Sequence, residues 1–311
     1  MNRHVDFPSP VFLTGATGFI GRPLVRALLA RGCEVSALVL PAEADRLPGE
    51  VRAFVGDISD AEVVAGAIAE AGPAVIYHLA AVGLTNPGLP MADALRVNVG
   101  GTINVLEGVR AAGDVGRVVL VGSSYEYGAR RSDDDLDPFN AYGASKSAAW
   151  AFARAAHNAW SSPLVWVRPF QVYGPGQPAK ALMPAAIQAA LYGDDFATTG
   201  GEQQRDFVYV GDVVEGLLAA GVAPDVEGRV LDLGTGRLTR VREVIDRVWS
   251  LAAAEGRILA GALPYRPGEV AAIPANVRRT RLLTGWEAAT SLDEGLALTI
   301  AALRREGKHA E

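Results

Sequence analysis

Short apolar runs alternate along this chain with longer segments whose apolar positions recur at helical spacing. The short runs predict strands over Val11–Thr14, Glu34–Leu40, Val51–Val55, Ala74–His78, Arg117–Val121, Leu164–Arg168 and Val230–Leu233. The longer segments predict helices over Arg22–Arg31, Ala61–Ala71, Met91–Ala112, Ala141–Trp160, Pro184–Leu191, Val210–Ala220 and Val241–Ala254. Strands that are apolar at successive positions are typical of a parallel sheet with helices on both faces.

The pattern changes after about Pro169, where proline, glycine and isolated arginines become more frequent. We therefore expect an α/β fold, in which a doubly wound parallel sheet is joined to a smaller C-terminal lobe that is interleaved with it in sequence. The expected sheet domain covers residues 1–170 and about 205–235, and the lobe covers about 171–204 and 236–311. At 311 residues, of which 50% are hydrophobic and 21% charged, the chain has ample length for a core.

Charge and cysteine content narrow the range of partners. The net charge of −6 gives no basic footprint for nucleic acid, so an anionic ligand needs a local cluster of arginines. Cys33 is the only cysteine, which excludes an intrachain disulfide and fits a reducing compartment. No apolar run approaches a membrane span, and no charged-then-apolar signal segment opens the chain. We expect a cytoplasmic protein with no nucleic-acid, membrane or metal partner.

The strand Val11–Thr14 runs directly into Thr14-Gly15-Ala16-Thr17-Gly18-Phe19-Ile20-Gly21, and a helical segment follows. In such a turn Gly15 permits the tight bend, Gly18 lets a pyrophosphate approach the backbone, and Gly21 lets helix and strand pack closely. The helix N-terminus offers free N–H groups and a positive dipole to the phosphates. The pattern predicts a Rossmann-type site for NAD or NADP.

The second predicted strand does not settle which of the two cofactors binds. It ends Leu38-Val39-Leu40-Pro41, without the carboxylate that normally holds the adenosine ribose of NAD. This absence favours NADP slightly, with Arg22 and Arg46 as candidates for the ribose phosphate. Asp57 follows the third strand, where its side chain either meets the adenine or stabilises a turn.

Tyr142 and Lys146 lie one helical turn apart in the segment Tyr142-Gly143-Ala144-Ser145-Lys146. An ammonium beside a phenol favours the phenolate, so this pair predicts a tyrosine that exchanges a proton with a substrate hydroxyl near neutral pH. Ser123 lies about twenty residues upstream. Together with the glycine-rich turn, these residues indicate an oxidoreductase.

These segments resemble the extended short-chain dehydrogenase/reductase family, in its nucleotide-sugar epimerase, dehydratase and reductase branch. The resemblance runs almost end to end. It rests on TGATGFIG at Thr14–Gly21, GDIS at Gly56–Ser59, YHLAA at Tyr77–Ala81, NVGGTINVLE at Asn98–Glu107, GSSYEYG at Gly122–Gly128, YGASK at Tyr142–Lys146, RPFQVYGPGQ at Arg168–Gln177, GGEQQRDFVYVGDVV at Gly200–Val214, LDLGTG at Leu231–Gly236, RPGE at Arg266–Glu269 and GW…SLDEGL at Gly285–Leu296.

The resemblance implies a role for each matching position. Tyr142 would be the acid/base, Lys146 its activator and ribose anchor, and Ser123 the hydroxyl that orients the reacting oxygen. The cofactor would be lined by Gly15, Gly18, Phe19, Ile20, Gly21, Asp57, Ile58, Ala80, Ala81, Asn98, Tyr142 and Lys146. The nucleotide sugar would meet Ser124, Gln171, Arg205 and Arg266. The two arginines occupy the positions that grip a diphosphate, whereas Gln171 replaces the family's usual Asn.

Several reactions share this scaffold. A 4,6-dehydratase carries an Asp and a Glu immediately after the catalytic Ser or Thr, where this chain has Ser124 and Tyr125, so dehydration is disfavoured. Reduction of an NDP-4-keto-6-deoxyhexose is the favoured prediction, because SSYEYG resembles the SSxEYG segment of GDP-4-keto-6-deoxymannose reductases. The alternative is an NDP-sugar 4-epimerase that holds NAD tightly, and a non-catalytic dinucleotide-sensing regulator is least favoured. The resemblance also implies a homodimer.

Overall fold

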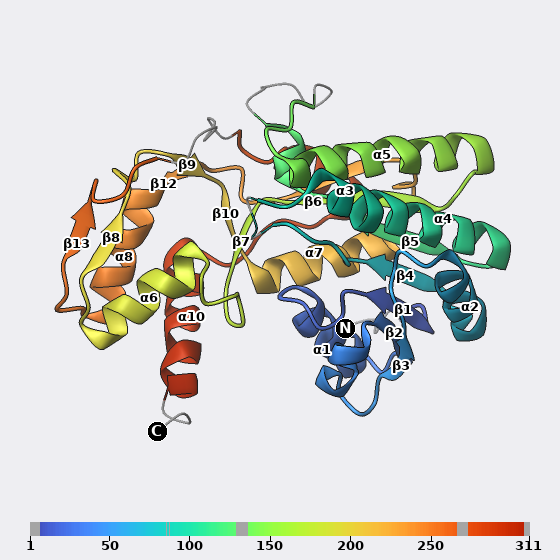
Figure 1. The fold of residues 1–311 in the computed structure, drawn as a ribbon, viewed down its shortest axis with the longest axis horizontal. Coiled ribbons are helices and arrows are strands. Elements are labelled where there is room, and N and C mark those ends of the chain that lie inside the picture. Colours follow the sequence, from blue (N-terminus) through green and yellow to red (C-terminus); the bar gives the residue numbers. More distant parts are fainter. Residues whose placement is uncertain (1–6, 85, 87, 129–135, 266–272, 308–311) are drawn as a thin grey trace.

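A seven-stranded parallel sheet forms the centre of the computed structural model, which describes residues 7–84, 86, 88–128, 136–265 and 273–307 (Figure 1). The strand order is β11-β6-β5-β4-β1-β2-β3. These strands are β1 (Val11–Thr14), β2 (Val35–Val39), β3 (Arg52–Val55), β4 (Val75–His78), β5 (Arg117–Val121), β6 (Leu164–Pro169) and β11 (Val230–Leu233). Because β1 lies between β2 and β4, the direction of winding reverses there, which in open α/β sheets creates a crevice at the carboxyl ends of the strands.

Helices cover both faces of the sheet. One apolar core joins α1 (Gly21–Ala30) and α7 (Val210–Val222) to one face, and a second core joins α2 (Ala61–Ala71), α4 (Gly101–Ala112) and α5 (Ala141–Trp160) to the other. Successive strand residues enter different cores: Val11 and Leu13 of β1 face the first, and Phe12 faces the second. Apolar residues therefore occupy successive positions in most of these strands, and the predicted doubly wound Rossmann-type fold is confirmed.

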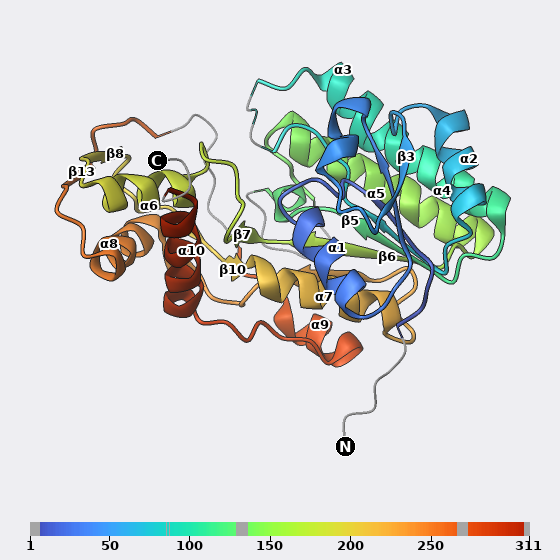
Figure 2. The same ribbon diagram turned by 90° about the horizontal axis from the view of Figure 1, so that it is seen from below.

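A smaller lobe is built from the C-terminal part of the chain (Figure 1). Its third core packs α6 (Leu182–Tyr192), α8 (Val241–Ala252) and α10 (Leu292–Gly307) together. Three two-stranded sheets complete it: β7 (Gln171–Tyr173) with β10 (Phe207–Tyr209), β8 (Phe196–Thr198) with β13 (Ile258–Ala260), and β9 (Gln204–Arg205) with β12 (Thr239–Arg240). Helix α9 (Val277–Thr284) lies on the side of α7 away from α5 (Figure 2).

Each predicted strand and helix has its counterpart, except that the segment predicted as one helix over Met91–Ala112 is interrupted. It consists of α3 (Met91–Ala94), a π-helical turn η2 (Leu95–Gly100) and α4. A π-helical turn inside a helix is rare and often occurs at functional sites. The sequence did not predict the short strands of the lobe or helices α9 and α10. Nor did it predict the 3₁₀ turns η1 (Pro41–Arg46) and η3 (Ser124–Glu126).

Among the residues that the structure describes, none of the helices is both long and apolar enough to cross a membrane. Nor do those residues include a group of three or more His, Cys, Asp or Glu arranged to hold a metal ion. The single cysteine, Cys33, is buried as a free thiol, and burial raises its pKa.

Candidate active site

The glycine-rich turn joins β1 to α1 and has space only for glycine at two of its positions. Gly15 has φ +71°, and a Cβ there would lie 2.7 Å from the Ala80 nitrogen at the end of β4. A Cβ on Gly21 would lie 2.0 Å from the Gly15 carbonyl oxygen. The tight bend at Gly15 and the close packing at Gly21 agree with the prediction from the sequence, and the turn also packs against the residues that follow β4.

The N-terminus of α1 faces this turn and has no side-chain cap, although the Arg22 N–H donates to the Gly18 carbonyl at 3.0 Å. Ile20, at the N-cap, makes no side-chain cap hydrogen bond, and the first turn of α1 carries no acidic residue. Side chains of Phe19 and Ile20 pack partly buried against the core, which fixes the turn. A glycine cradle with an uncapped helix N-terminus fits the pyrophosphate of a dinucleotide.

The adenosine end of the predicted cofactor site is bordered by the end of β2. Leu40 is exposed there, and Arg46 on η1 donates from Nη2 to the Thr17 carbonyl of the glycine-rich turn at 3.3 Å. Arg22 donates instead to the Gly176 carbonyl at 3.2 Å. Of the two arginines considered for a ribose phosphate, Arg46 is the one that contacts the glycine-rich turn close to the end of β2.

Asp57 and Ile58 follow β3 and have defined local roles. Asp57 Oδ1 accepts from the backbone and hydroxyl of Ser59, both at 2.8 Å, and these bonds and Arg96 lower the pKa of Asp57 although desolvation acts against them. The turn role that the sequence left open is thus observed. Ile58 is buried and packs against Gly101, because a Cβ on Gly101 would lie 2.9 Å from the Ile58 side chain.

Ala80, Ala81 and Asn98 lie at the carboxyl end of β4 and on the π-helical turn. Asn98 is fully buried, accepts from the Val82 backbone at 2.8 Å and donates to the Ser145 hydroxyl at 2.8 Å. Ser145 donates in turn to the Tyr142 carbonyl at 2.7 Å. Asn98 therefore ties the segment after β4 to the first turn of α5, which carries Tyr142.

The structure brings Ser123, Tyr142 and Lys146 together at the carboxyl end of β5. Ser123 follows β5, and its hydroxyl lies close enough to the Tyr142 phenol to lower the pKa of that phenol. Lys146 donates from Nζ to the carbonyl of Val121, the last residue of β5, at 2.7 Å. The Tyr125 ring packs edge-on against the Tyr142 ring, with centroids 5.9 Å apart.

The phenol is held in its protonated form. Burial raises the pKa of Tyr142, the Ser123 hydrogen bond lowers it, and the charge of Glu126 raises it further. The net direction is opposite to the one predicted from the Tyr142–Lys146 spacing, because desolvation of the phenolate dominates and Lys146 is not among the contributing groups. A phenol in this state is a proton donor.

Lys146 is 2% exposed, and burial lowers the pKa of its ammonium to about 8 while Glu126 acts in the opposite direction. His78 on β4 is buried, with Nδ1 2.7 Å from the Thr14 hydroxyl and Nε2 3.1 Å from the Thr102 hydroxyl. Burial and the charge of Lys146 lower the pKa of His78 to about 3, so this imidazole is neutral and structural.

Glu126 is offset by one position from the acid of a dehydratase, and the structure shows where it points. Its side chain is fully buried beneath Ser123 and forms an ion pair of 2.8 Å with Arg168. Ser124 and Tyr125 are only partly buried and carry no carboxylate. The described residues thus offer no acid after Ser123 for a dehydration step.

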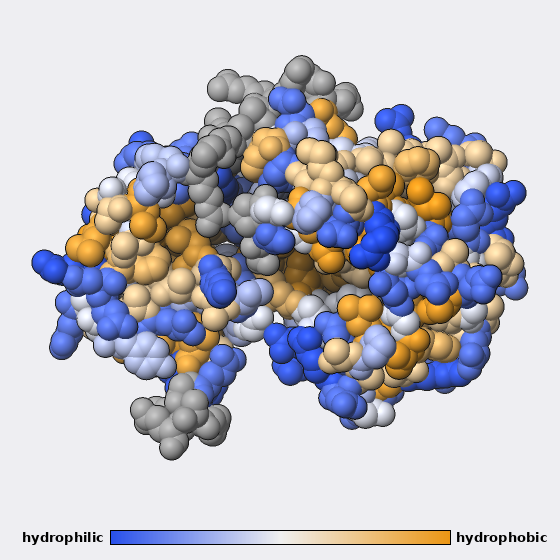
Figure 3. Space-filling view, in the orientation of Figure 1, coloured by the Kyte–Doolittle hydropathy of each residue, from blue (hydrophilic) through white to orange (hydrophobic). Residues whose placement is uncertain are grey.

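The predicted substrate residues are more scattered. Ser124 opens η3, and Gln171 begins β7, where its backbone donates to the Asp206 carbonyl at 2.9 Å. Arg205 lies on β9 and donates from Nη1 to the Gln204 carbonyl at 2.7 Å. Arg266 lies outside the described residues. Figure 3 shows the surface hollowed where the lobe meets the body that carries the sheet.

Asp206, which the sequence analysis did not select, organises the backbone beside Arg205. It is 2% exposed and accepts from the backbones of Thr235, Gly236 and Ala275 at 2.8, 2.9 and 3.0 Å. The signal in the sequence is its place between Arg205 and a buried Phe207. A carboxylate that holds two distant segments in place also fixes the strand that presents Arg205.

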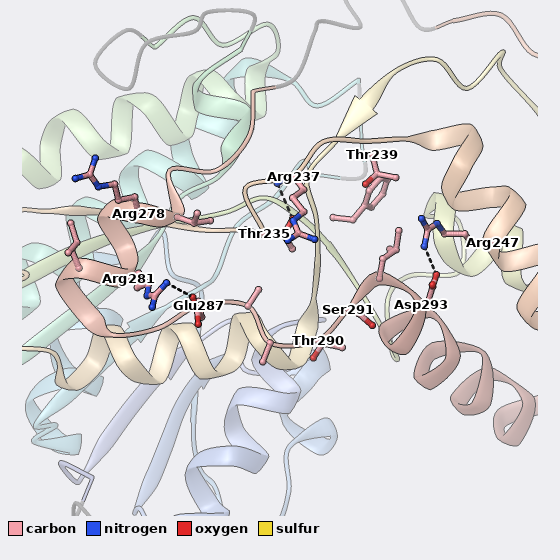
Figure 4. Close-up of a pocket in the computed structure, with 17 residues that line it drawn as sticks. Thr235, Arg237, Thr239, Arg247, Arg278, Arg281, Glu287, Thr290, Ser291 and Asp293 are labelled. Atoms are coloured by element: carbon pink, nitrogen blue, oxygen red, sulfur yellow. Dashed lines mark hydrogen bonds and ion pairs between the residues drawn. The ribbon is translucent and has the colours of Figure 1, made fainter.

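A cavity of about 1090 Å³ lies between α8, α9 and the start of α10 (Figure 4). Its lining includes Arg237, Arg247, Arg278 and Arg281, of which Arg247 is paired with Asp293 at 2.7 Å and Arg281 with Glu287 at 3.2 Å. None of Ser123, Tyr142 and Lys146 lines it. This cavity therefore does not include the Ser123–Tyr142–Lys146 cluster, although Phe207 and Thr235 of its lining lie beside the Arg205–Asp206 segment.

Comparison with known proteins identifies the family to which the chain belongs. The sequence model described as "NAD dependent epimerase/dehydratase family" matches residues 11–234. The chain is 32% identical to a UDP-glucose 4-epimerase of Mycolicibacterium smegmatis, over 95% of this chain and 99% of that protein. It is 29% identical to a dTDP-glucose 4,6-dehydratase of Streptomyces griseus, over 94% and 93%.

A solved structure shares the whole architecture. MoeE5 in complex with UDP-glucuronic acid and NAD is 34% identical to this chain and superposes with a TM-score of 0.85, over 96% of this chain and 100% of that one. The family assignment rests on this shared fold and on features of the present chain: the glycine-rich turn, Ser123, Tyr142 and Lys146. The chain belongs to the NAD-dependent epimerase/dehydratase family, within the extended short-chain dehydrogenases/reductases.

Proposed function

We propose that the protein is an NAD(P)-dependent oxidoreductase that acts at C4 of an NDP-hexose, and that its net reaction is the reduction of an NDP-4-keto-6-deoxyhexose. The observation that carries the proposal is the juxtaposition of Ser123 and Tyr142 at the carboxyl end of β5, with Lys146 one turn further along α5. The same edge of the sheet carries the glycine-rich turn, because β1, β4 and β5 are parallel neighbours.

In this proposal Gly15, Gly18 and the N-terminus of α1 hold the pyrophosphate of the dinucleotide, which supplies the hydride when bound. Ser123 donates a hydrogen bond to the oxygen on C4, and Tyr142 donates the proton that this oxygen takes up. Lys146, buried one turn further along α5, binds the ribose. Arg205 and Arg266 bind the diphosphate.

Two features of this chain favour the reductive direction. Burial raises the pKa of Tyr142, so the phenol carries the proton that reduction requires. The end of β2 carries Leu40 and Pro41 in place of a carboxylate, and Arg46 borders the adjacent glycine-rich turn. Both features suit an enzyme that binds NADPH and exchanges it at each turnover.

The second candidate function is 4-epimerisation with tightly held NAD, and the relatives favour it. Among them are the UDP-glucose 4-epimerase of Mycolicibacterium smegmatis and the UDP-glucose 4-epimerase of Thermotoga maritima solved with UDP-glucose. An epimerase needs the same three side chains. Dehydration is not proposed, because Glu126, which follows Ser123 by three positions, is buried in an ion pair with Arg168.

The experiment that separates these reactions starts from purified protein, in which mass spectrometry identifies any retained dinucleotide. Retained NAD, with conversion of UDP-glucose to its C4 epimer, supports the epimerase. Empty protein that oxidises NADPH with an NDP-4-keto-6-deoxyhexose supports the reductase. Absence of both activities, in protein that binds dinucleotide, contradicts the proposed function.

The diphosphate contact has its own test. Replacing Arg205 by Ala removes binding that the ground state and the transition state share, so we expect KM for the nucleotide sugar to rise about 10-fold or more with little change in kcat. Arg240→Ala, which removes an exposed arginine from the paired strand β12, is the matched control. A fall in kcat at unchanged KM contradicts the assigned role.

A further inference from the structure

We infer that Glu126 is a positioning residue for Ser123: its buried carboxylate, anchored by Arg168 and Trp166, holds the Ser123 backbone N–H and thereby sets the Ser123 hydroxyl against Tyr142. The inference rests on the proposed function for its kinetic consequences. It assigns a part in the reaction to a residue that neither contacts the reacting atoms nor lies at the acid position of a dehydratase.

Glu126 and Ser123 are joined by a reciprocal cap at the two ends of η3. The Ser123 backbone N–H donates to Glu126 Oε1 at 2.8 Å, while the Ser123 hydroxyl oxygen accepts from the Tyr125 backbone N–H at 3.2 Å. The first bond fixes the Ser123 backbone, and the second restricts the rotation of its side chain. Both leave the hydroxyl hydrogen free for the Tyr142 oxygen.

The carboxylate is itself immobilised on the opposite side. Arg168 donates from Nε to Oε2 at 2.8 Å, and the Trp166 indole N–H lies 3.1 Å from Oε1 and 3.2 Å from Oε2. All these recorded contacts are with donors, so the group is held as the carboxylate although burial raises the pKa of Glu126. Three donors arranged around one buried anion leave it no second orientation.

The backbone around Glu126 is shaped to contain this group. A Cβ on Gly122 would lie 2.2 Å from Glu126 Oε1 and 2.3 Å from Trp166 Nε1, so only glycine leaves room for the carboxylate at that position. On the side of α5, the closest approach is between Gly143 and the Tyr125 carbonyl, where a Cβ would come within 2.5 Å. Glu126 therefore packs against one side of the turn that carries Ser123, and α5 packs against another.

The charged and titratable groups around Glu126 come from three elements. Arg168 on β6 forms the ion pair with Glu126. The charge of Glu126 acts on the pKa of Tyr142 and of Lys146, both on α5. Asp232 on β11 is linked to Arg168 through the Tyr127 hydroxyl. The charge of Glu126 raises the pKa of both Tyr142 and Lys146. Neutralising it therefore lowers both pKa values, and the alkaline limb of a pH–rate profile moves to lower pH.

The test is Glu126→Gln in the full-length protein. Whichever way the new amide turns, its NH₂ group faces either the Ser123 N–H or the Arg168 Nε–H, so one contact of the anchor is lost. We expect kcat to fall about 10- to 100-fold, KM values to stay within about 3-fold, and the alkaline limb to shift to lower pH. In a Ser123→Ala background the same substitution should change kcat less than about 3-fold, because the residue through which Glu126 acts is gone.

Two comparisons keep the outcome decisive. Asp232→Asn removes another buried carboxylate of the same network, one that does not contact Ser123, and should leave the pH profile in place. Glu126→Asp keeps the charge beside Arg168 but is one methylene shorter, so kcat should fall without the alkaline shift; this variant replaces Glu126→Gln if the latter does not fold. An equal loss of kcat with and without Ser123, or an unchanged kcat, overturns the inference.

One readout does not depend on turnover. Hydrogen exchange at the Ser123 amide, followed by NMR, should be at least about 10-fold faster in Glu126→Gln than in the parent and unchanged in Asp232→Asn. If no nucleotide sugar is turned over, the proposed function fails while this measurement still decides the role of Glu126. Unaltered protection of the Ser123 amide contradicts the positioning role in every case.

Discussion

Two buried cations lie on either side of Ser123, and they are compensated in different ways. Arg168 on β6 is 1% exposed, pairs with Glu126 at 2.8 Å and donates from Nη1 to the Tyr127 hydroxyl at 2.9 Å. Lys146 on α5 is 2% exposed and donates to the Val121 carbonyl, and no ion pair is recorded for it within the described part of the chain.

The difference separates a structural charge from a labile one. The Glu126 charge, the Tyr127 hydrogen bond and Asp232 raise the pKa of Arg168 although desolvation opposes them, so this guanidinium stays charged at any pH that the protein tolerates. Burial without a paired carboxylate lowers the pKa of Lys146 to about 8, close to the pH of the cell. The charge of Arg168 on the β6 side is therefore fixed, whereas Lys146 on the α5 side changes its charge near pH 8.

The largest effect is expected at the group that transfers the proton. Tyr142→Phe removes the phenolic hydroxyl and should lower kcat by about 10⁴-fold, the upper range for a positioned acid. Dinucleotide binding, measured by fluorescence or calorimetry, should stay within about 3-fold of the parent. Near-normal turnover by this variant would remove the basis for assigning chemistry to the α5 side.

Arg168→Met breaks the fixed side of the comparison. It leaves the Glu126 carboxylate buried without its cation, so we expect the free energy of unfolding to fall by about 3–5 kcal/mol in denaturant titrations. The double variant Arg168→Met/Glu126→Gln removes both charges and should recover most of that loss. A single variant as stable as the parent would show that the pair is not what stabilises β6.

Lys146→Met tests the labile side through pH. Because the pKa of Lys146 is about 8 in the folded state and 10.5 as its ordinary value, the unfolded chain binds more protons between these pH values. The stability contribution of this group is therefore present above about pH 10.5 and lost as pH falls through 8. The parent should gain up to about 3 kcal/mol over that window relative to Lys146→Met, and parallel stability curves for the two proteins would refute the shift.

An exposed arginine provides the smallest effect and calibrates the other two. Arg247 bridges Glu243 and Asp293, both at 2.7 Å, on the surface of the lobe. Exposed ion pairs contribute little, so Arg247→Met should change the free energy of unfolding by less than about 1 kcal/mol. A loss as large as that of Arg168→Met would mean that burial does not explain the difference between the two arginines.

The sequence predicts the sheet and the placement of Tyr142 and Lys146 on one helix well, because both depend on local signals. Buried parallel strands are continuous apolar runs, and two residues four positions apart on a helix lie on one face whatever surrounds them. The glycine-rich turn is equally local, because steric contacts within the β1–α1 unit and with Ala80 decide it.

The parts that the sequence does not predict depend on distant partners. The pKa of Tyr142 follows from burial, which the spacing of Tyr142 and Lys146 does not contain. The sequence shows only that Glu126 is offset from the acid position of a dehydratase. Its contacts with Arg168 and Trp166, about forty residues away, are visible only in the folded chain. The π-helical turn around Asn98 and the two-residue strands β9 and β12 are likewise fixed by tertiary contacts.

Helix α9 has a consequence for how the chain can be divided. Strand β11 ends the sheet, and Thr280 of α9 both donates to the Asp232 carbonyl and accepts from the Asp232 N–H, each at 2.9 Å, while the Asn276 backbone donates to the Asp232 carboxylate at 3.1 Å. These contacts cover backbone groups that would otherwise recruit a strand from another molecule. A fragment cut at residue 234, where the family match stops, would keep every residue of the Ser123–Tyr142–Lys146 cluster and yet expose a sheet margin prone to self-association.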